Sequence, residues 1–350
     1  MTTTMQPRQV GRSGLWVSPL AFGTGTFAAG PDWPYGDTGV EKARWMIDRC
    51  LDVGLTLFDS ADVYGSGACQ EVLGEAIGGR RDRLLISAKV GLPTGPGPAD
   101  TGSGRSRLIT SCETALRRLR TDHVDLLQLH AFDARTPLEE TLSALGSLVT
   151  AGKVRYVGAS NFAAWQLMKA LAVADAHDLP RFVGQQVYYS LVGRDYELEL
   201  MPLGLDQGVG ALVWSPLAGG WLGGDIRRSQ PPAPGSRVDL VGAYGPPTDP
   251  ELVYYVVDVL DEIAAETGHT VAQVALNWLL QKPTVASVVF GANTEEQLEH
   301  NLGAVGWDLA ADQVARLDAA GTTTPPYPVY MYHRDPGFTD LAPVPLPRTF

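Results

Sequence analysis

Short apolar runs alternate with longer amphipathic stretches along most of the chain. Runs such as LTLFD and VDLLQLH are almost continuously apolar, which is typical of strands buried on both faces of a parallel sheet. The stretches between them repeat apolar residues every three or four positions, as Leu138, Leu142 and Leu145 do, which is typical of helices that cover a sheet. The predicted strands are residues 20–23, 55–59, 84–89, 124–130, 154–160, 181–186, 210–215 and 286–290.

Eight strands, each followed by a helix, predict a single α/β domain over residues 1–350, a (β/α)₈ barrel of the TIM type. The segment QVGRSGLWV before it predicts an N-terminal β-hairpin around a Ser-Gly turn. Two segments interrupt the alternation. Residues 218–249 form a long loop after strand 7, rich in Gly and Pro, and residues 320–350 form a tail expected to pack over the barrel or in an interface.

Composition narrows the classes of function. The net charge of −12 disfavours binding to nucleic acids and to anionic membranes. The N-terminus lacks the apolar core of a signal peptide and no stretch is long enough to span a membrane, so we expect a cytoplasmic protein. Cys50, Cys69 and Cys112 form neither a CxxC pair nor a metal-ligand pattern, so we expect reduced packing residues and no metal site.

Polar residues stand where the predicted strands end, which is where barrel enzymes gather their chemistry. Asp59 and Tyr64 follow the second strand, Lys89 closes the third, and His130 closes the fourth. A tyrosine with an ordinary pKa of about 10 is a poor proton donor at neutral pH, and a neighbouring ammonium group would lower that pKa. Asp59 would hold Lys89 in place, and His130 would donate a hydrogen bond to a carbonyl oxygen. The pattern predicts a site that protonates an oxygen as negative charge develops on it.

The chain resembles the aldo-keto reductase superfamily, and within it the bacterial reductases and the potassium-channel β-subunits. The resemblance extends from the hairpin to about residue 305. It rests on seven ordered segments, GRSGLWVSPLAFGTGTF, LFDSADVYG, ALRRLRTDHVDLLQLH, GKVRYVGASNF, QQVYYSL, WSPLAGG and GANTEEQLEHNLGA. It implies reduction of a small-molecule aldehyde or ketone with NAD(P)H, with Tyr64 as proton donor, Asp59 and Lys89 tuning it, and His130 orienting the carbonyl.

The resemblance also implies a cofactor site. Ser160, Asn161 and Gln186 match the residues that hold the nicotinamide carboxamide, and Trp214 matches the aromatic residue that stacks on the ring. A stacked aromatic leaves one ring face open, and a fixed carboxamide keeps the hydride donor aligned with the carbonyl carbon. The remaining implied contacts are Gly23, Thr24, Asp59, Ser215, Pro216, Leu217, Gly219, Gly291, Asn293, Gln297 and Asn301.

The adenine end leaves the choice of nucleotide open. Relatives often place Arg at the position of Asn293, whereas this chain has no Lys or Arg from 291 to 301. A 2′-phosphate is usually met by a cation, so the absence of one here weakens a strong preference for NADP. The resemblance by itself still favours NADP, with NAD as the alternative. Thr294 and Gln297 also fit a capping box, which needs no ligand.

Two other functions stay open. A buried Lys89 with a lowered pKa could form a Schiff base, as in a lyase. Alternatively, the protein could be a non-catalytic regulatory subunit that keeps the cofactor as a redox sensor. The sequence leaves the substrate and the oligomeric state open, and the few charges in its loops favour a largely neutral substrate.

Several residues have structural interpretations. Asp62 is expected to cap a turn and Asp125 to anchor the fourth strand, while residues 117–120 (RRLR) are expected to be a solvated helix end. Aromatic residues in the loops either line a substrate pocket or pack; they are Phe27, Trp33, Tyr35 and Trp221.

Overall fold

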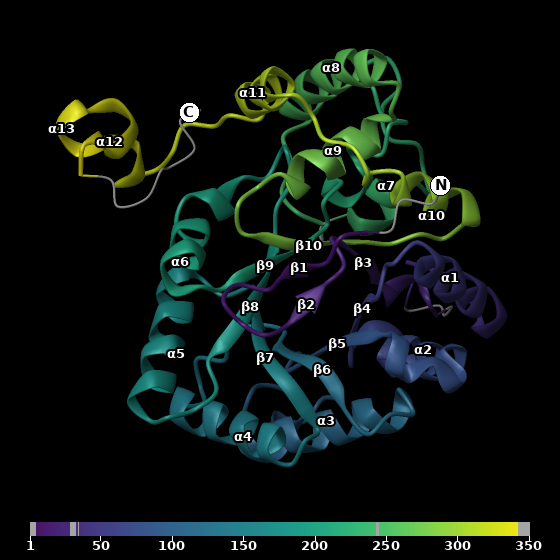
Figure 1. Ribbon diagram of the computed structural model, residues 1–350, viewed down its shortest axis with the longest axis vertical. Helices are drawn as coiled ribbons and strands as arrows, with labels where there is room; N and C mark the ends of the chain where they lie inside the picture. The colour runs from purple at the N-terminus through teal and green to yellow at the C-terminus, as the bar shows by residue number, and fades with distance from the viewer. Residues whose placement is uncertain (1–4, 29–32, 34, 243–244, 342–350) are drawn as a thin grey trace.

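The computed structural model describes residues 5–28, 33, 35–242 and 245–341. Its parallel strands form a closed barrel in the order β10-β3-β4-β5-β6-β7-β8-β9, shown in Figure 1. The strands are β3 Leu20–Gly23, β4 Leu57–Ala61, β5 Leu85–Val90, β6 Val124–Leu129, β7 Val154–Ser160, β8 Phe182–Tyr188, β9 Gly210–Trp214 and β10 Val285–Phe290. Each overlaps a predicted strand, which confirms the (β/α)₈ barrel.

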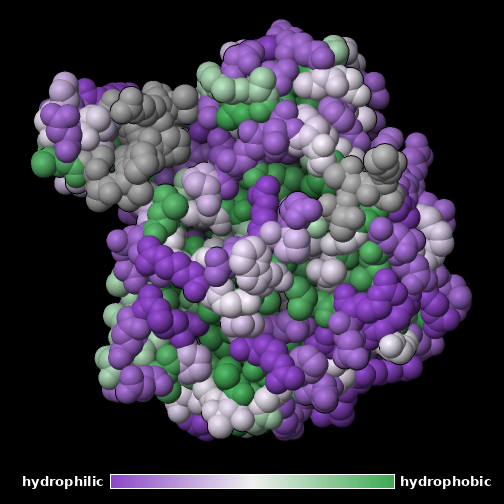
Figure 2. All heavy atoms as spheres, in the orientation of Figure 1, coloured by the Kyte–Doolittle hydropathy of each residue, from purple (hydrophilic) through white to green (hydrophobic). Residues whose placement is uncertain are grey.

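Helices surround the barrel and pack their apolar faces, predicted from the sequence periodicity, against it. Leu138, Leu142 and Leu145 are buried on α4, as that periodicity predicts. The surrounding helices are α1 Val40–Asp52, α2 Ala68–Ile77, α3 Arg105–Arg118, α4 Leu138–Thr150, α5 Ala164–Ala176, α6 Leu200–Gln207, α8 Pro250–Thr267, α9 Val271–Leu280, α10 Glu295–Leu302 and α11 Ala311–Ala320. On the face shown in Figure 2, polar side chains dominate the outer surface and hydrophobic ones form scattered patches.

The predicted hairpin closes the N-terminal end of the barrel. Its strands are β1 Arg8–Gln9 and β2 Trp16–Val17, and they pair antiparallel. Val10 and Leu15 of the hairpin are buried in one apolar cluster with Leu57 and Leu212 from the barrel strands. Gly11 is needed at the turn, because it has a φ of +57° and a Cβ there would lie 2.1 Å from the Gly208 carbonyl oxygen.

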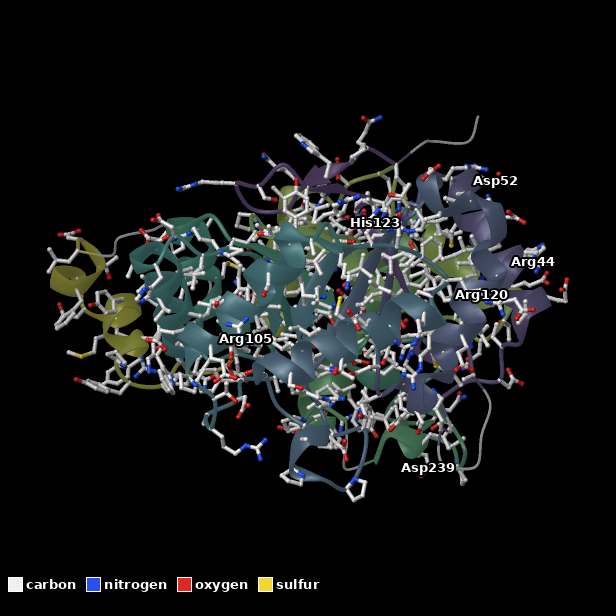
Figure 3. The ribbon with its side chains drawn as sticks, turned by 90° about the horizontal axis from the view of Figure 1, so that it is seen from below. Arg44, Asp52, Arg105, Arg120, His123 and Asp239 are labelled. Carbon is white, nitrogen blue, oxygen red and sulfur yellow. The ribbon has the colours of Figure 1, made fainter. Side chains whose placement is uncertain are left out.

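The opposite end of the barrel is therefore the open one. Figure 3 shows the hairpin at one end of the molecule and Asp239, on the short helix α7 (Arg237–Val241), at the other. The strands run from the hairpin towards the α7 end, so their carboxyl ends and the loops that follow them lie together on that side. We call this side the barrel mouth.

The two irregular segments have local structure of their own. The loop after β9 contains α7 and a short antiparallel bridge between Arg227 and Gln230. The described part of the tail forms α12 (Val329–Arg334) and α13 (Pro336–Thr339), which lie beside the ring of helices and not across the barrel (Figure 1). Residues 29–32 and 34 after β3, 243–244 in the loop after β9 and 342–350 in the tail lie outside the described residues.

Several structural interpretations can be compared with the fold. Asp125 does anchor its strand, accepting hydrogen bonds from Arg81 and from the Ile86 backbone, both at 2.8 Å. The three cysteines are free and buried, as predicted. Phe27 is fully buried with its ring centroid 5.2 Å from that of Phe22, so it belongs to the core and does not line a pocket. Within the described part of the chain, no helix is long and apolar enough to cross a membrane.

Candidate active site

The register of β4 and β5 brings Asp59 and Lys89 together at the barrel mouth. Asp59 is paired in register with Ser87, and Lys89 with Ala61, so the two side chains come from adjacent strands, near the carboxyl ends of those strands. Asp59 is 2% exposed and Lys89 is 1% exposed, and the two form an ion pair. Desolvation of two charges is expensive, so a buried pair persists only when other groups satisfy it.

Two further side chains hold the Asp59 carboxylate, and a third holds one of those two. The Ser87 hydroxyl and the Gln186 amide both donate to its Oδ1, each at 2.9 Å, and Gln128 donates to Ser87 at 2.8 Å. Gln186, assigned to the nicotinamide carboxamide on resemblance, therefore already has a partner within the protein. Sequence reasoning missed Ser87 and Gln128, because nothing local distinguishes them from other polar residues in strands.

Lys89 is held as an ammonium ion. Burial by itself lowers its pKa, but the carboxylate of Asp59 and the Tyr64 hydroxyl outweigh that effect and raise the pKa above its usual value. A nucleophilic lysine needs the opposite shift, so this environment argues against Schiff-base chemistry at Lys89.

Tyr64 lies in the turn after β4, close to both Lys89 and His130. The Lys89 ammonium lies 5.1 Å from its ring centroid, and its ring centroid is 6.0 Å from that of His130. Burial raises the pKa of Tyr64, while Lys89 lowers it; the net shift is upward, opposite to the shift we expected. Tyr64 therefore keeps its proton at neutral pH, as a proton donor must.

His130 follows β6 and is neutral. Burial, with the nearby Lys89 charge, lowers its pKa to about 3. Its Nδ1 atom is buried and has no hydrogen-bond partner among the described residues. A neutral imidazole can donate one N–H to a carbonyl oxygen, and this ring lies beside Tyr64, where such an oxygen would receive its proton.

The next three strands present the residues assigned to the nicotinamide. Ser160 stands opposite Gln186 in the β7–β8 register, and Tyr188 stands opposite Trp214 in the β8–β9 register. Ser160 is 1% exposed, and its hydroxyl oxygen has no partner among the described residues. An unpaired buried hydroxyl is unusual and is consistent with a ligand contact at this point.

Asn161 links this group to His130. Its backbone has a φ of +59°, uncommon for a residue other than glycine. Its amide donates to the His130 carbonyl oxygen at 3.0 Å and accepts from the Trp214 indole at 3.1 Å. The arrangement fits a flat ring beside Trp214 with its polar edge towards Ser160 and Asn161.

The turn after β9 also adopts strained backbone conformations. Ser215 and Ala218 both have a φ of +50°, and Gly219 has a φ of +68°. The Gly219 N–H donates to the Ser215 hydroxyl at 2.9 Å, which closes a compact turn that includes Pro216 and Leu217. Strained backbone of this kind is concentrated at ligand sites, and pyrophosphate contacts at this turn stay a prediction.

The first strand supports Asp59. Gly23 is paired in register with Asp59, and the buried Thr24 hydroxyl donates to the Asp59 carbonyl oxygen at 3.0 Å. Thr24 therefore fixes the backbone that carries the carboxylate, whatever it contributes to a cofactor.

At the expected adenine end, Gln297 and Asn301 have structural partners, whereas the side-chain oxygen of Asn293 is buried without a hydrogen-bond partner among the described residues. Thr294 caps α10 by accepting from the Gln297 N–H at 3.1 Å, as the capping box requires. The reciprocal bond differs from that motif, because the Gln297 side chain accepts from the Asn293 N–H at 2.7 Å and not from Thr294. Asn301 donates to the Gly291 carbonyl oxygen at 3.3 Å.

A cation does reach this end, from a distant part of the chain. Lys42, in the first turn of α1, donates to the Asn293 carbonyl oxygen. The local sequence from 291 to 301 could not show it, because 251 residues separate the two partners.

Aromatic side chains line the mouth on two sides. Trp33 packs on Tyr64 at 5.5 Å between ring centroids and on Tyr35 at 4.8 Å. On the other side, the ring centroid of Phe132 lies 5.8 Å from that of Trp165, a residue that is 62% exposed. The structure thus places Trp33 and Tyr35 at the site. By contrast, Trp221 is half-buried against the main core, and sequence reasoning missed Phe132 and Trp165.

Arg237 comes back to this mouth from the loop after β9. Its guanidinium lies 4.5 Å from the Tyr35 ring centroid, and the aliphatic part of the side chain lies against Gly220. Sequence reasoning missed it, because the Gly- and Pro-rich loop gave no indication of where it returns.

Comparisons with known proteins agree with this geometry. The model of the aldo/keto reductase family matches residues 19–322. The chain is 38% identical to a probable voltage-gated potassium channel subunit beta from Arabidopsis thaliana, over 86% of this chain and 91% of the relative. It is 36% identical to the uncharacterized oxidoreductase YrpG of Bacillus subtilis (90% and 95% covered) and 32% identical to L-glyceraldehyde 3-phosphate reductase of Escherichia coli K12 (90% and 92%). The barrel, the residues at its mouth and these matches together show that the chain belongs to the aldo/keto reductase family.

Proposed function

We propose that this protein is an NADPH-dependent reductase of a small aldehyde or ketone, with Tyr64 as the general acid. The observation that carries the proposal is one buried cluster at the barrel mouth, in which an Asp59–Lys89 ion pair lies against Tyr64 and beside a neutral His130. Ser160, with its unpaired hydroxyl, lies at the same mouth. Such a cluster supports proton donation beside the proposed nicotinamide site.

Each residue has a distinct task. His130 donates a hydrogen bond to the carbonyl oxygen and orients it towards the Tyr64 hydroxyl. Tyr64 then transfers its proton as negative charge grows on that oxygen, and the Lys89 ammonium stabilises the phenolate that remains. Asp59 keeps Lys89 charged and fixed. When bound, NADPH would supply the hydride to the carbonyl carbon.

The residues at the mouth fit a nicotinamide. Trp214 offers an aromatic face, Ser160 an unpaired buried hydroxyl, and Asn161 a fixed amide. At the other end, Lys42 could meet a 2′-phosphate beside Asn293, which supports NADP over NAD. The aromatic side chains at the rim support a largely apolar substrate, held with its carbonyl towards Tyr64 and His130.

A second function has one observation in its favour. The relative from Arabidopsis thaliana is named as a potassium channel subunit beta, so a regulatory subunit that binds the cofactor with little turnover is the alternative proposal. The catalytic cluster does not discriminate between the two, because a redox sensor would use the same residues.

A cofactor titration separates these outcomes. NADPH and NADH are titrated while tryptophan fluorescence is followed, with Trp214→Phe to identify the reporting side chain, and bound NADPH is then mixed with a panel of aromatic, aliphatic and phosphorylated aldehydes. Binding with turnover supports the reductase. Binding without turnover on any carbonyl supports the regulatory subunit, and absence of binding contradicts both.

A further inference from the structure

The loop that carries Tyr64 has a strained backbone. We call residues 62–67 the Tyr64 loop. Three consecutive residues, Gly65, Ser66 and Gly67, have φ values of +54°, +55° and +98°. Left-handed backbone costs on the order of 1–3 kcal/mol at a residue other than glycine and persists only where surrounding contacts enforce it. The position of the Tyr64 hydroxyl thus depends on what holds this loop.

The back of the loop faces a cavity instead of packed side chains. A cavity of about 340 Å³ separates the loop from α3 and from the segment after β5. Its lining residues are Asp62, Val63, Ser66, Pro93, Thr94, Arg107, Ser111, Thr114 and Arg118. On this side, therefore, the loop lacks close packing, and polar contacts across the gap hold it instead.

Arg118, in the last turn of α3, holds the loop on both sides of Tyr64. Its guanidinium donates to the Ser66 carbonyl oxygen at 3.2 Å and to the Asp62 carbonyl oxygen at 3.5 Å. A Cβ on Gly67 would lie 2.1 Å from the Arg118 Cζ atom, so only glycine leaves room for the guanidinium there. Arg118 is thus more than the solvated helix end we expected.

Arg107, in the first turn of α3, also holds the loop, through the side chain of Asp62. It donates to the Asp62 carboxylate at 3.4 Å and to the Thr94 hydroxyl at 2.9 Å. Asp62 is 3% exposed, and its backbone N–H donates to the Lys89 carbonyl oxygen at 3.1 Å. The side chain of Asp62 therefore pairs with an arginine, where we had expected it to cap a turn. The two arginines are three helical turns apart, so both project from one face of α3.

We propose that Arg107 and Arg118 are positioning residues that hold the Tyr64 loop so that the Tyr64 hydroxyl points at the carbonyl oxygen. Neither arginine contacts the reacting atoms. This inference rests on the proposed reductase function, because its kinetic readout is proton donation by Tyr64.

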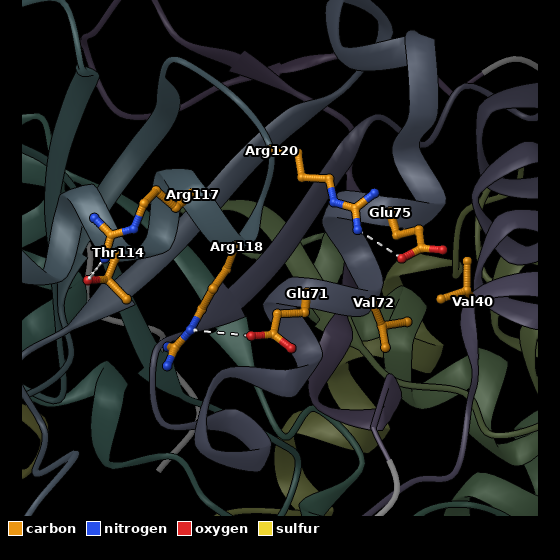
Figure 4. Close-up of a pocket in the computed structure, with 8 residues that line it drawn as sticks. All are labelled: Val40, Glu71, Val72, Glu75, Thr114, Arg117, Arg118 and Arg120. Atoms are coloured by element: carbon orange, nitrogen blue, oxygen red, sulfur yellow. Dashed lines mark hydrogen bonds and ion pairs between the residues drawn. The ribbon is translucent and has the colours of Figure 1, made fainter.

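The neighbouring arginine offers a matched control. Arg117 is exposed and donates to the Thr114 hydroxyl at 2.9 Å, while Arg118 lies 4.0 Å from Glu71 (Figure 4). We expect Arg118→Met to lower the single-turnover rate of NADPH oxidation about 10- to 100-fold, since small misplacements of a catalytic group have effects of this size. The dissociation constant of NADPH stays within twofold, and Arg117→Met leaves both unchanged. An Arg118→Met rate within twofold of the wild type overturns the proposal.

Two further variants apply if Arg118→Met does not fold. Arg118→Lys keeps the charge but cannot span two carbonyl oxygens, so it should show an intermediate loss of rate. Gly67→Ala should displace the guanidinium and lower the rate, and the double variant Gly67→Ala/Arg118→Lys should be no slower than the slower single variant. Fully additive losses in the double variant contradict a shared role.

The pH profile gives a readout that general destabilisation would not produce. Burial raises the pKa of Asp62 to about 6, opposed by Arg107 and Arg118, which face it from α3. As the pH falls through about 6, Asp62 takes up a proton and its ion pair with Arg107 is lost, so the wild-type rate should decline. Asp62→Asn should be slower above pH 6 and lack this decline. A decline that persists in Asp62→Asn argues against the proposal.

Hydrogen exchange separates failure of this inference from failure of the proposed function. Amides of residues 62–67 should exchange faster in Arg118→Met than in Arg117→Met, whether or not the wild type turns over. If the wild type shows no turnover but Arg118→Met still exchanges faster, the support of the loop by Arg118 stands and the reductase function is rejected. Unchanged exchange would reject the positioning role itself.

Discussion

The two ends of the barrel are built from the same eight strands and differ completely in chemistry. At the hairpin end, Val10, Leu15 and Leu57 form an apolar cluster. At the mouth, Asp59 and Lys89 are just as buried, but they carry charge and are held by Ser87 and other polar side chains. Burial of apolar side chains at the hairpin end stabilises the folded state. Burial of charged side chains at the mouth has a desolvation penalty, which their polar partners offset.

Substitutions at the two ends of the barrel should therefore have different effects. Changes at the hairpin end should lower the free energy of unfolding and leave the chemistry intact. Changes at the mouth should abolish the chemistry, and their effect on stability should depend on whether a charge is left without its partner.

The largest expected effect is at the Asp59–Lys89 pair. Asp59→Asn leaves a buried ammonium without its carboxylate, which should lower the free energy of unfolding by about 3–5 kcal/mol and turnover by about 10²-fold or more. The double variant Asp59→Asn/Lys89→Met should regain much of the stability but none of the turnover. Urea unfolding and NADPH oxidation measure the two effects. A single variant as stable as the wild type would show that pairing does not offset the buried charge.

The next effect is at the opposite end. Leu15 is 5% exposed, and Leu15→Ala should lower the free energy of unfolding by about 2–3 kcal/mol, since it leaves a cavity between the hairpin and the barrel. The neighbouring Trp16 is 56% exposed, and Trp16→Ala should change stability little. Both variants should keep the turnover number of the wild type. A large loss of turnover in Leu15→Ala would show that the two ends are not independent.

The smallest effect sharpens the contrast within the mouth itself. Lys42→Met should weaken NADPH binding about 10-fold and leave NADH binding unchanged, because only NADPH carries a 2′-phosphate for the ammonium group to meet. Arg44→Met, on the same helix α1 and exposed (Figure 3), serves as the control. Equal weakening of both nucleotides would mean that Lys42 supports α10 through Asn293 and does not select the cofactor.

The barrel and the cluster at its mouth could be predicted from the sequence because both are local patterns; the catalytic role of that cluster stays a prediction. Each of Asp59, Lys89 and His130 stands at the end of an apolar run, and the barrel places such ends together. Lys42 and Arg118 could not be found this way, since their partners, Asn293 and the Tyr64 loop, are far away in the chain. The net pKa shift of Tyr64 was also out of reach, because burial, which opposes Lys89, depends on packing.

The central claim is that Tyr64 donates the proton, and Tyr64→Phe tests it most directly. NADPH is bound first, and its oxidation by an aromatic aldehyde is followed in a single turnover. The control is Tyr156→Phe, which removes a hydroxyl near the hairpin end of the barrel. We expect Tyr64→Phe to lower the rate about 10²–10⁴-fold with the NADPH dissociation constant unchanged, and Tyr156→Phe to match the wild type. A Tyr64→Phe enzyme that oxidises bound NADPH at the wild-type rate would contradict the central claim.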